Sequence, residues 1–192
     1  MLAEVCLTEI RLITVAEYHK MAEAGILDSD ERVELIDGQI LKMAAKGTAH
    51  SSATTRTEKL LEQRLEGQAW IRVQEPIRLN NYSEPEPDVA VVQIDPLDYA
   101  DHHPIVPEVY LVIEVADSSL RADCEFKSKV YARSGITDYW VLDVVQRTLH
   151  VFREPTQTGY QTERVLLEDA TIAPLQFPDV TIAIAAMLPK FH

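Results

Sequence analysis

The sequence predicts an α/β (α+β) fold in which helices flank a mixed central β-sheet. Two apolar runs with the length and β-branched content of buried strands occupy residues 89–92 and 109–113. Helical patterns of apolar residues lie at residues 51–66 and 122–134, before and after these runs. The order of helix, three strands, helix, strand and strand favours one sheet covered by helices.

Two further elements are expected on the N-terminal side of this core. Thr14-Val15-Ala16-Glu17 has the spacing of a capping box, which predicts a short helix that ends at Gly25. Two short strands, 32–36 and 39–43, then flank Asp37-Gly38. This dipeptide is typical of a two-residue hairpin turn, because both central residues of that turn need positive φ. The sequence therefore predicts an N-terminal helix and a β-hairpin.

Other extended segments are expected after each of the two longer helices. They are residues 70–74, 76–79, 139–142 and 149–152, followed from Pro155 by edge strands and a closing segment. The polar loop at 95–107 contains His102-His103, which has no metal-ligand spacing in the sequence. We interpret this histidine pair as solvated.

Length and composition favour one domain that spans residues 1–192. With 192 residues and 46% hydrophobic content, the chain can bury a sizeable core. No apolar run approaches the roughly 20 residues that cross a bilayer, and the segment 1–6 lacks a signal-peptide layout. We therefore expect a cytoplasmic protein without membrane contact, in which Cys6 and Cys124 stay reduced.

The net charge argues against an ordinary nucleic-acid binder. At −13, the average field of the protein repels polyanions, whereas most nucleic-acid binders have a basic face. A local basic groove and bound metal ions can compensate for an acidic total. The basic residues expected to gather on one side are Arg56, Arg64, Arg72, Arg78, Lys127, Lys129 and Arg133.

Glu114 is the strongest candidate for a functional residue. It follows the apolar run 109–113, and an unpaired buried carboxylate is costly enough to need a partner such as a divalent metal. Asp88 opens the upstream apolar run, and Lys127 lies in the helix that follows Glu114. Two acids on strands and a lysine on a helix are the residue types used in metal-dependent phosphodiester hydrolysis.

Structural roles are also consistent with the sequence at several of these positions. Asp88 could cap a turn, and Glu114 could face solvent from an amphipathic strand. Lys127 and Asp123 have the spacing of an ordinary surface pair on a helix, worth about 0.3 kcal/mol. The aromatic residues Tyr131, Tyr139 and Trp140 are interpreted as core or interface residues.

Four segments carry a resemblance to a known family. They are VELIDGQI, EPEPDVAVV, YLVIEVADSS and DCEFKSKVYARSGITDYWVLD. Together they resemble the Uma-two-type family of restriction endonucleases, over nearly the whole chain from about Thr14. The most distinctive feature is the joint spacing of Asp123, Lys127, Tyr131, Gly135 and Tyr139-Trp140. The resemblance implies a PD-(D/E)XK restriction-endonuclease-like core.

The resemblance also implies roles for individual residues. The implied catalytic residues are Asp88, Glu114, Lys127 and Glu34, with Asp88 and Glu114 as metal ligands. His50 matches a family histidine at the start of a helix. In the usual signature the lysine lies two residues after the second acid, where this chain has Ala116. The resemblance therefore implies that the lysine has moved to the helix, at Lys127.

The expected function is that of an endonuclease that uses Mg²⁺ or Mn²⁺ to hydrolyse DNA, because carboxylate oxygens suit these cations. A homodimer is expected, since two related sites are the simplest way to cut two strands. Two alternatives stay open. A nuclease-fold binding or assembly module without turnover is favoured by the acidic charge and by Ala116. A small-nucleotide phosphodiesterase would tolerate the acidity better than a duplex binder.

Overall fold

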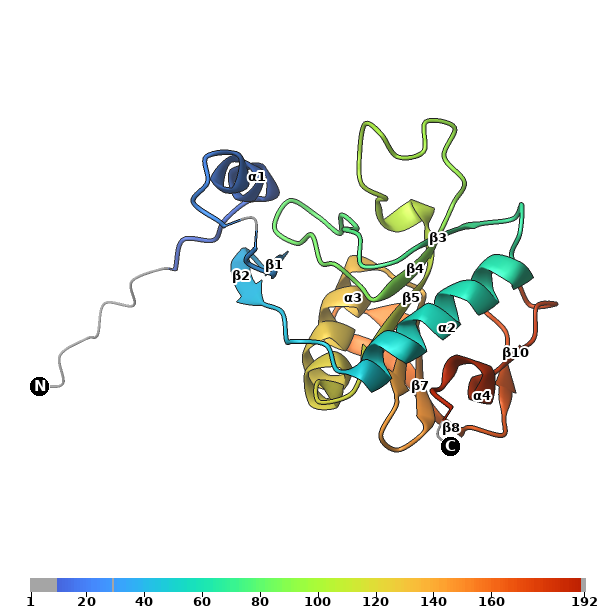
Figure 1. Cartoon of the computed structure of the whole chain (residues 1–192). Coiled ribbons are helices and arrows are strands. Elements are labelled where there is room, and N and C mark those ends of the chain that lie inside the picture. Colours follow the sequence, from blue (N-terminus) through green and yellow to red (C-terminus); the bar gives the residue numbers. More distant parts are fainter. Residues whose placement is uncertain (1–9, 29, 191–192) are drawn as a thin grey trace, which may run out of the picture.

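The centre of the molecule is a six-stranded mixed sheet with the order β3-β4-β5-β6-β7-β8 (Figure 1). The computed structural model describes residues 10–28 and 30–190, so the predictions for residues 1–6, including Cys6, lie outside the described residues. Neighbouring strands of the sheet are antiparallel except β5 and β6, which are parallel. The strands are β3 (Trp70–Arg72), β4 (Val89–Val92), β5 (Val109–Ala116), β6 (Asp138–Asp143), β7 (Thr148–Thr156) and β8 (Gly159–Leu167).

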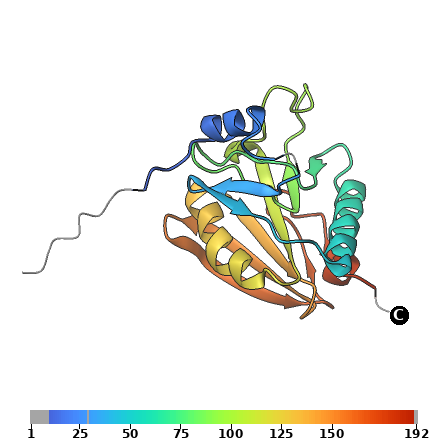
Figure 2. The same ribbon diagram turned by 60° about the vertical axis from the view of Figure 1, so that its left-hand side comes forward.

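Helices cover both faces of this sheet, which confirms the predicted fold class (Figure 2). Side chains alternate along a strand, and the two core clusters follow this alternation in β5. Ile113 and Val115 pack in the same cluster as Leu61 of α2 (Thr48–Arg64). Val112 packs in the other cluster with Val130 of α3 (Ser128–Ser134). Helices α2 and α3 therefore lie on opposite faces of the sheet.

The predicted N-terminal helix and hairpin are confirmed. Helix α1 (Val15–Glu23) begins at a capping box, in which the Thr14 hydroxyl accepts a hydrogen bond from the Glu17 N–H. Strands β1 (Val33–Ile36) and β2 (Gln39–Lys42) are joined by Asp37 and Gly38, whose φ angles are 51° and 69°. A Cβ atom on Gly38 would lie 2.5 Å from the Cβ of Leu12. Both the backbone conformation and this close approach therefore require glycine.

The predicted extended segment 76–79 lies outside the central sheet. Its backbone forms an isolated bridge between Arg78 and Ile105, a hydrogen bond to Pro104 and further hydrogen bonds within the 76–85 loop. The three prolines Pro76, Pro85 and Pro87 lack a backbone N–H and cannot donate to a ladder. Instead, Glu84 donates its N–H to the carbonyl of Leu35, so this loop joins the hairpin to the core.

The predicted helix at 122–134 is present, but its first part is a π-helix, η2 (Ala122–Lys127). The N–H of Ser128 donates to the carbonyl of Asp123, the i to i+5 pattern of a π-turn. Gly135 ends α3 in the left-handed conformation, with a φ of 96°. The π-turn changes which side chains share a helix face, and it occurs where Lys127 and Asp123 lie.

The remaining elements are short. They are the 3-10 helix η1 (Val106–Glu108), the strand pair β9 (Thr171–Ile172) and β10 (Ile182–Ala183), and helix α4 (Ile184–Met187). Helix α4 packs in the same core cluster as α2. Cys124 is a free thiol. Across residues 10–28 and 30–190, the helices are too short or too polar to cross a membrane.

Candidate active site

A cavity of about 230 Å³ lies at the end of β5 where the strand meets η2 and the hairpin. All four predicted catalytic residues line it, together with His50 at the start of α2. Further acidic and basic residues on its wall are Lys42, Lys46, Glu86, Asp117 and Asp123. The structure thus brings these predicted side chains together at one cavity.

Strand register places Asp88 beside Glu114. Strands β4 and β5 are antiparallel with Val89 opposite Ile113, so the residue before β4 lies next to the residue after Ile113. The N–H of Asp88 donates to Glu114 Oε2 at 3.3 Å, and the N–H of Val115 donates to Asp88 Oδ2 at 2.9 Å. Both carboxylates are buried, with 7% and 3% of each residue exposed. Two neighbouring acids are therefore buried side by side at the wall of one cavity.

Lys127 reaches this pair from the helix side. Its Nζ lies 3.0 Å from Glu114 Oε1 and 3.1 Å from Glu34 Oε1. Glu34 comes from β1, and it also accepts a hydrogen bond from the Glu86 N–H at 3.3 Å. The lysine thus joins two acids that are far apart in the sequence, which brings Glu34 into the same site.

Two further side chains of the same helical segment approach the acids. The hydroxyl of Tyr131 donates to Glu114 Oε1 at 3.0 Å, while its ring packs in the core. Asp123 lines the cavity, and its Oδ2 accepts a hydrogen bond from the Ser119 hydroxyl at 2.6 Å. Tyr131 therefore combines the predicted core role with a direct contact to a site carboxylate.

His50 orients Asp88 from α2. Its Nε2 lies 2.9 Å from Asp88 Oδ2, and the imidazole is buried. On the other oxygen, the Nζ of Lys46 lies 3.6 Å from Asp88 Oδ1. Sequence reasoning missed Lys46, because a single lysine in the polar connection between β2 and α2 shows no pattern that distinguishes it from a surface residue.

The charges of the site are strongly perturbed by burial. Burial raises the pKa of Glu114 to about 8, although the charge of Lys127 opposes this shift. Burial by itself would lower the pKa of the Lys127 ammonium, but the carboxylates of Glu114, Glu34 and Asp123 raise it above its ordinary value. Burial by itself would raise the pKa of Asp88. The hydrogen bond and the charge of His50 outweigh this effect and hold the pKa below its usual range. The two central acids thus titrate in different ranges.

Glu114→Gln is expected to remove a pH dependence of stability. The pKa of Glu114 is about 8 in the folded protein and about 4.3 in an unfolded chain, so the folded state holds an extra proton between these values. The stability that protonated Glu114 contributes is fully present below about pH 4. It is lost as the pH rises to about 8, by up to roughly 1.4 kcal/mol per pH unit.

This pH dependence of stability is measured by thermal unfolding in metal-free buffer. The Tm of Glu114→Gln relative to that of the unmodified protein should rise from about pH 5 to about pH 8. Glu62→Gln, which changes an exposed acid of α2, is the control. A Tm difference for Glu114→Gln that does not change with pH would contradict the assignment.

Ala116 occupies the strand position at which the usual signature has lysine. Its side chain is fully buried and packs in the core cluster on the α3 side of the sheet. A lysine here would have to displace apolar neighbours, whereas Lys127 delivers its ammonium to Glu114 from the helix.

The prediction that the basic residues form one patch is wrong. Arg56 and Arg64 belong to α2, whereas Lys129 and Arg133 belong to α3, on the opposite face of the sheet. The topology decides which face each helix covers, and this could not be read from the spacing of basic residues.

Two other residues of the predicted basic patch have partners within the protein: Arg72 pairs with Glu75, and Arg78 donates a hydrogen bond to Asn81. Lys42 and Lys46 line the cavity instead.

The mixed sheet, with a helix on each face and acids at the junction of β4 and β5, has the nuclease-like fold of restriction-endonuclease-type proteins. The chain belongs to the Uma2 family, described as "Putative restriction endonuclease", which matches residues 15–185. The resemblance to this family that was noted in the sequence is thereby confirmed.

A solved structure supports the same fold. It is a crystal structure of a protein from Anabaena variabilis, described as a "putative nuclease" belonging to DUF820. The TM-score is 0.69, at 17% sequence identity, and the match covers 91% of this chain and 97% of that one. No curated protein matches the chain.

Proposed function

We propose that this protein is an endonuclease that uses Mg²⁺ or Mn²⁺ to hydrolyse phosphodiester bonds in DNA. One observation carries the proposal: two buried acids, one just before β4 and one in β5, converge with a lysine of η2 on one cavity. The family described as restriction endonucleases supports DNA as the substrate.

The donor set of the cavity fits a hard divalent cation. Asp88 and Glu114 offer carboxylate oxygens, and Glu34 and Asp123 lie on the same wall. Mg²⁺ and Mn²⁺ prefer oxygen ligands and bind through one or two carboxylates with several waters. We propose Asp88 and Glu114 as the protein ligands. The bound cation would polarise the phosphoryl oxygen and lower the pKa of a bound water.

Lys127 acts in this proposal as a fixed positive charge. Because the surrounding carboxylates raise its pKa, the ammonium keeps its proton near neutral pH. It can therefore stabilise negative charge that develops on a phosphate, but it is poorly suited to accept a proton. His50 holds Asp88 in position through its Nε2 contact, and Tyr131 holds Glu114 through its hydroxyl.

The DNA backbone is proposed to approach the cavity past Lys42 and Lys46. Lys42 is at the end of β2, with 81% of its side chain exposed and its Nζ 3.3 Å from Glu31 Oε1, and Lys46 lies next to Asp88. These lysines offset part of the acidic charge at the one place where a phosphate must come close. With so few basic contacts, we expect weak DNA affinity.

Lys42→Ala is expected to reduce the salt dependence of DNA binding. A phosphate contact contributes about 0.9 to the slope of log affinity against log salt, so losing one contact reduces the slope by about that amount. Binding is measured by fluorescence anisotropy in Ca²⁺, over a series of salt concentrations. Arg164→Ala, which changes an exposed residue of the edge strand β8, is the control. An unchanged slope in Lys42→Ala would contradict this path.

The function is tested by incubating supercoiled plasmid with the full chain and increasing Mg²⁺ or Mn²⁺. We expect nicked and linear products that depend on the cation and disappear with EDTA. Glu114→Gln, purified in the same way, shows whether a contaminating nuclease is responsible. Two closely spaced nicks, giving linear DNA at low extents of reaction, would fit the homodimer that the sequence leads us to expect.

Other outcomes would favour the alternatives. Hydrolysis of small nucleotide diesters with no cleavage of plasmid would favour a small-nucleotide phosphodiesterase, which the net charge of −13 would suit. Binding of Mg²⁺ with no hydrolysis of either substrate would favour a binding or assembly module. Either result would overturn the proposal of a DNA endonuclease.

A further inference from the structure

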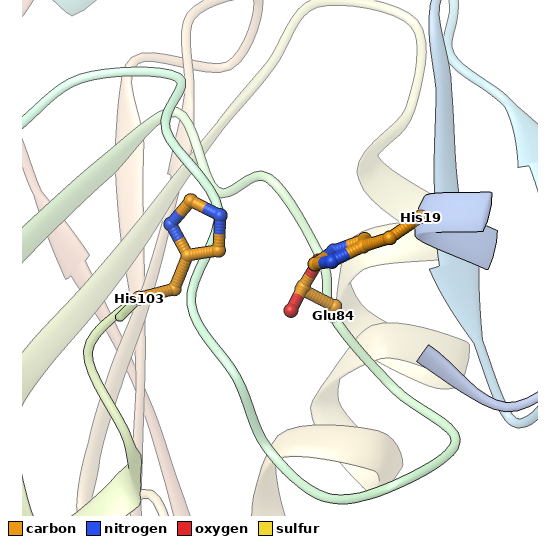
Figure 3. Close-up of side chains that lie close together, drawn as sticks. All are labelled: His19, Glu84 and His103. Carbon is orange, nitrogen blue, oxygen red and sulfur yellow. The ribbon is translucent and has the colours of Figure 1, made fainter. Parts of the chain in front are cut away.

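A second cluster of possible metal ligands lies outside the candidate active site. His19, Glu84 and His103 each offer one ligand atom, and these atoms all lie within 4.8 Å of one another. Figure 3 shows the two imidazole rings on either side of the Glu84 carboxylate. The sequence predicts a solvated His103, but in the structure this residue is half-buried and faces the cluster.

Three segments that are remote in the sequence supply these side chains. His19 belongs to α1, Glu84 to the loop that leads into β4, and His103 to the connection between β4 and β5. No metal-ligand spacing exists in the sequence, because the residues meet only when α1 and the two loops pack together. This is why the pattern could not be read from the chain.

Two polar atoms of the cluster lack a hydrogen-bond partner. They are Glu84 Oε2 and His103 Nδ1, both buried from solvent. Glu84 itself is only 3% exposed, and its Oε1 lies 2.5 Å from His19 Nε2. Leaving a buried polar atom unpaired typically costs about 1–3 kcal/mol. Two such atoms, close to the Nε2 of His19, form a group of three side chains that can donate electron pairs to one bound ion.

A cation supplies such a partner, and the donor set indicates its kind. Two imidazole nitrogens and one carboxylate oxygen are a common ligand set for Zn²⁺, whereas Mg²⁺ prefers oxygen alone. Tetrahedral ligands at the usual Zn–N distance lie roughly 3.3 Å apart. Modest side-chain movements would bring the three atoms to this spacing.

We propose that His19, Glu84 and His103 bind a Zn²⁺ ion at a site distinct from the Asp88–Glu114 cavity. Three protein ligands leave the fourth position of the ion for water or for a further ligand. The ion would join α1 to the loop that carries Glu84, and that loop also pairs with Leu35 of the hairpin. It would therefore fix the N-terminal elements, which hold Glu34, against the core.

The test is a Zn²⁺ titration of the full chain after treatment with a chelator and its removal. Glu114→Gln serves as the background for all proteins, so that the acidic cavity contributes less to binding. We expect one Zn²⁺ per chain and a rise in Tm on binding. His19→Gln and His103→Gln should each weaken binding by at least about 100-fold, because removing only an outer-shell partner of a metal ligand costs up to about that much.

His102→Gln is the matched control. This neighbouring histidine contacts Asp101 and Glu108 rather than the cluster, and we expect its substitution to leave Zn²⁺ affinity unchanged. Equal affinity in His19→Gln, or no binding of Zn²⁺ to the background protein, would overturn the proposal. These outcomes do not depend on cleavage, so the proposed zinc site is tested independently of the nuclease function.

X-ray absorption at the zinc edge adds a measurement that needs no substitution in the cluster. In the zinc-loaded chain, we expect nitrogen and oxygen neighbours at about 2.0–2.1 Å and the outer-shell scattering of two imidazoles. A spectrum of oxygen neighbours without imidazole scattering would place the ion among the acids of the other cavity and refute the assignment.

Discussion

Lys127→Gln is expected to lower the rate of DNA cleavage by about 10²- to 10⁴-fold, the usual range for a positioned group that stabilises charge. The ammonium lies 3.0 Å from Glu114 and 3.1 Å from Glu34, at the wall of the cavity where a phosphate would bind. Gln keeps an N–H donor for these acids but removes the positive charge. The loss should therefore appear in the rate at saturating Mg²⁺.

The measurement is single-turnover cleavage of plasmid, with Mg²⁺ affinity determined separately by calorimetry. Lys129→Gln removes a charge two residues away from an exposed position, and we expect normal cleavage from it. The Tm of Lys127→Gln in metal-free buffer shows how far the unpaired acids destabilise the fold. Unchanged cleavage in a folded Lys127→Gln variant would refute the role of the lysine.

Asp88→Asn is expected to abolish detectable cleavage and to weaken Mg²⁺ binding by at least about 100-fold, since losing only an outer-shell partner of a metal ligand costs up to about that much. The substitution keeps the size of the side chain but removes a charged ligand from a site that offers few. The pKa of Asp88 lies below its usual range, because His50 offsets the effect of burial, so the carboxylate is ionised and ready to bind a cation. Asn cannot supply this charge at any pH.

Calorimetric titration with Mg²⁺ and the plasmid assay together check this expectation. Asp179→Asn changes an exposed acid in the C-terminal part of the chain and serves as the control. Loss of Mg²⁺ binding with cleavage retained would refute the proposed metal site, as would normal Mg²⁺ affinity in Asp88→Asn. Loss of both Mg²⁺ binding and cleavage would support Asp88 as a metal ligand.

Local patterns in the sequence were sufficient for several elements. The capping box at Thr14 and the hairpin at Asp37-Gly38 were predicted because each depends on residues only a few positions apart. Glu114 was singled out because a carboxylate within an apolar run breaks the pattern of a buried strand. These features depend on short-range geometry, which the sequence displays directly.

The wider site needed family resemblance as well as these patterns. Nothing in the spacing of residues 34 and 127 indicates an ion pair, yet the resemblance placed both in one site, and the two side chains lie 3.1 Å apart. The π-turn in η2 was not predicted, because the helical pattern of apolar residues does not reveal a single widened turn.

The sequence by itself determined most of the elements, the buried acid at Glu114 and the acidic charge of this protein. Only the tertiary structure decided that the predicted basic residues lie on opposite faces of the sheet and that Lys46 lies beside Asp88. It also decided the meeting of His19 with His103. The physical reason is that such contacts depend on which face each helix covers and how each loop packs, and these are long-range outcomes of burying one common core.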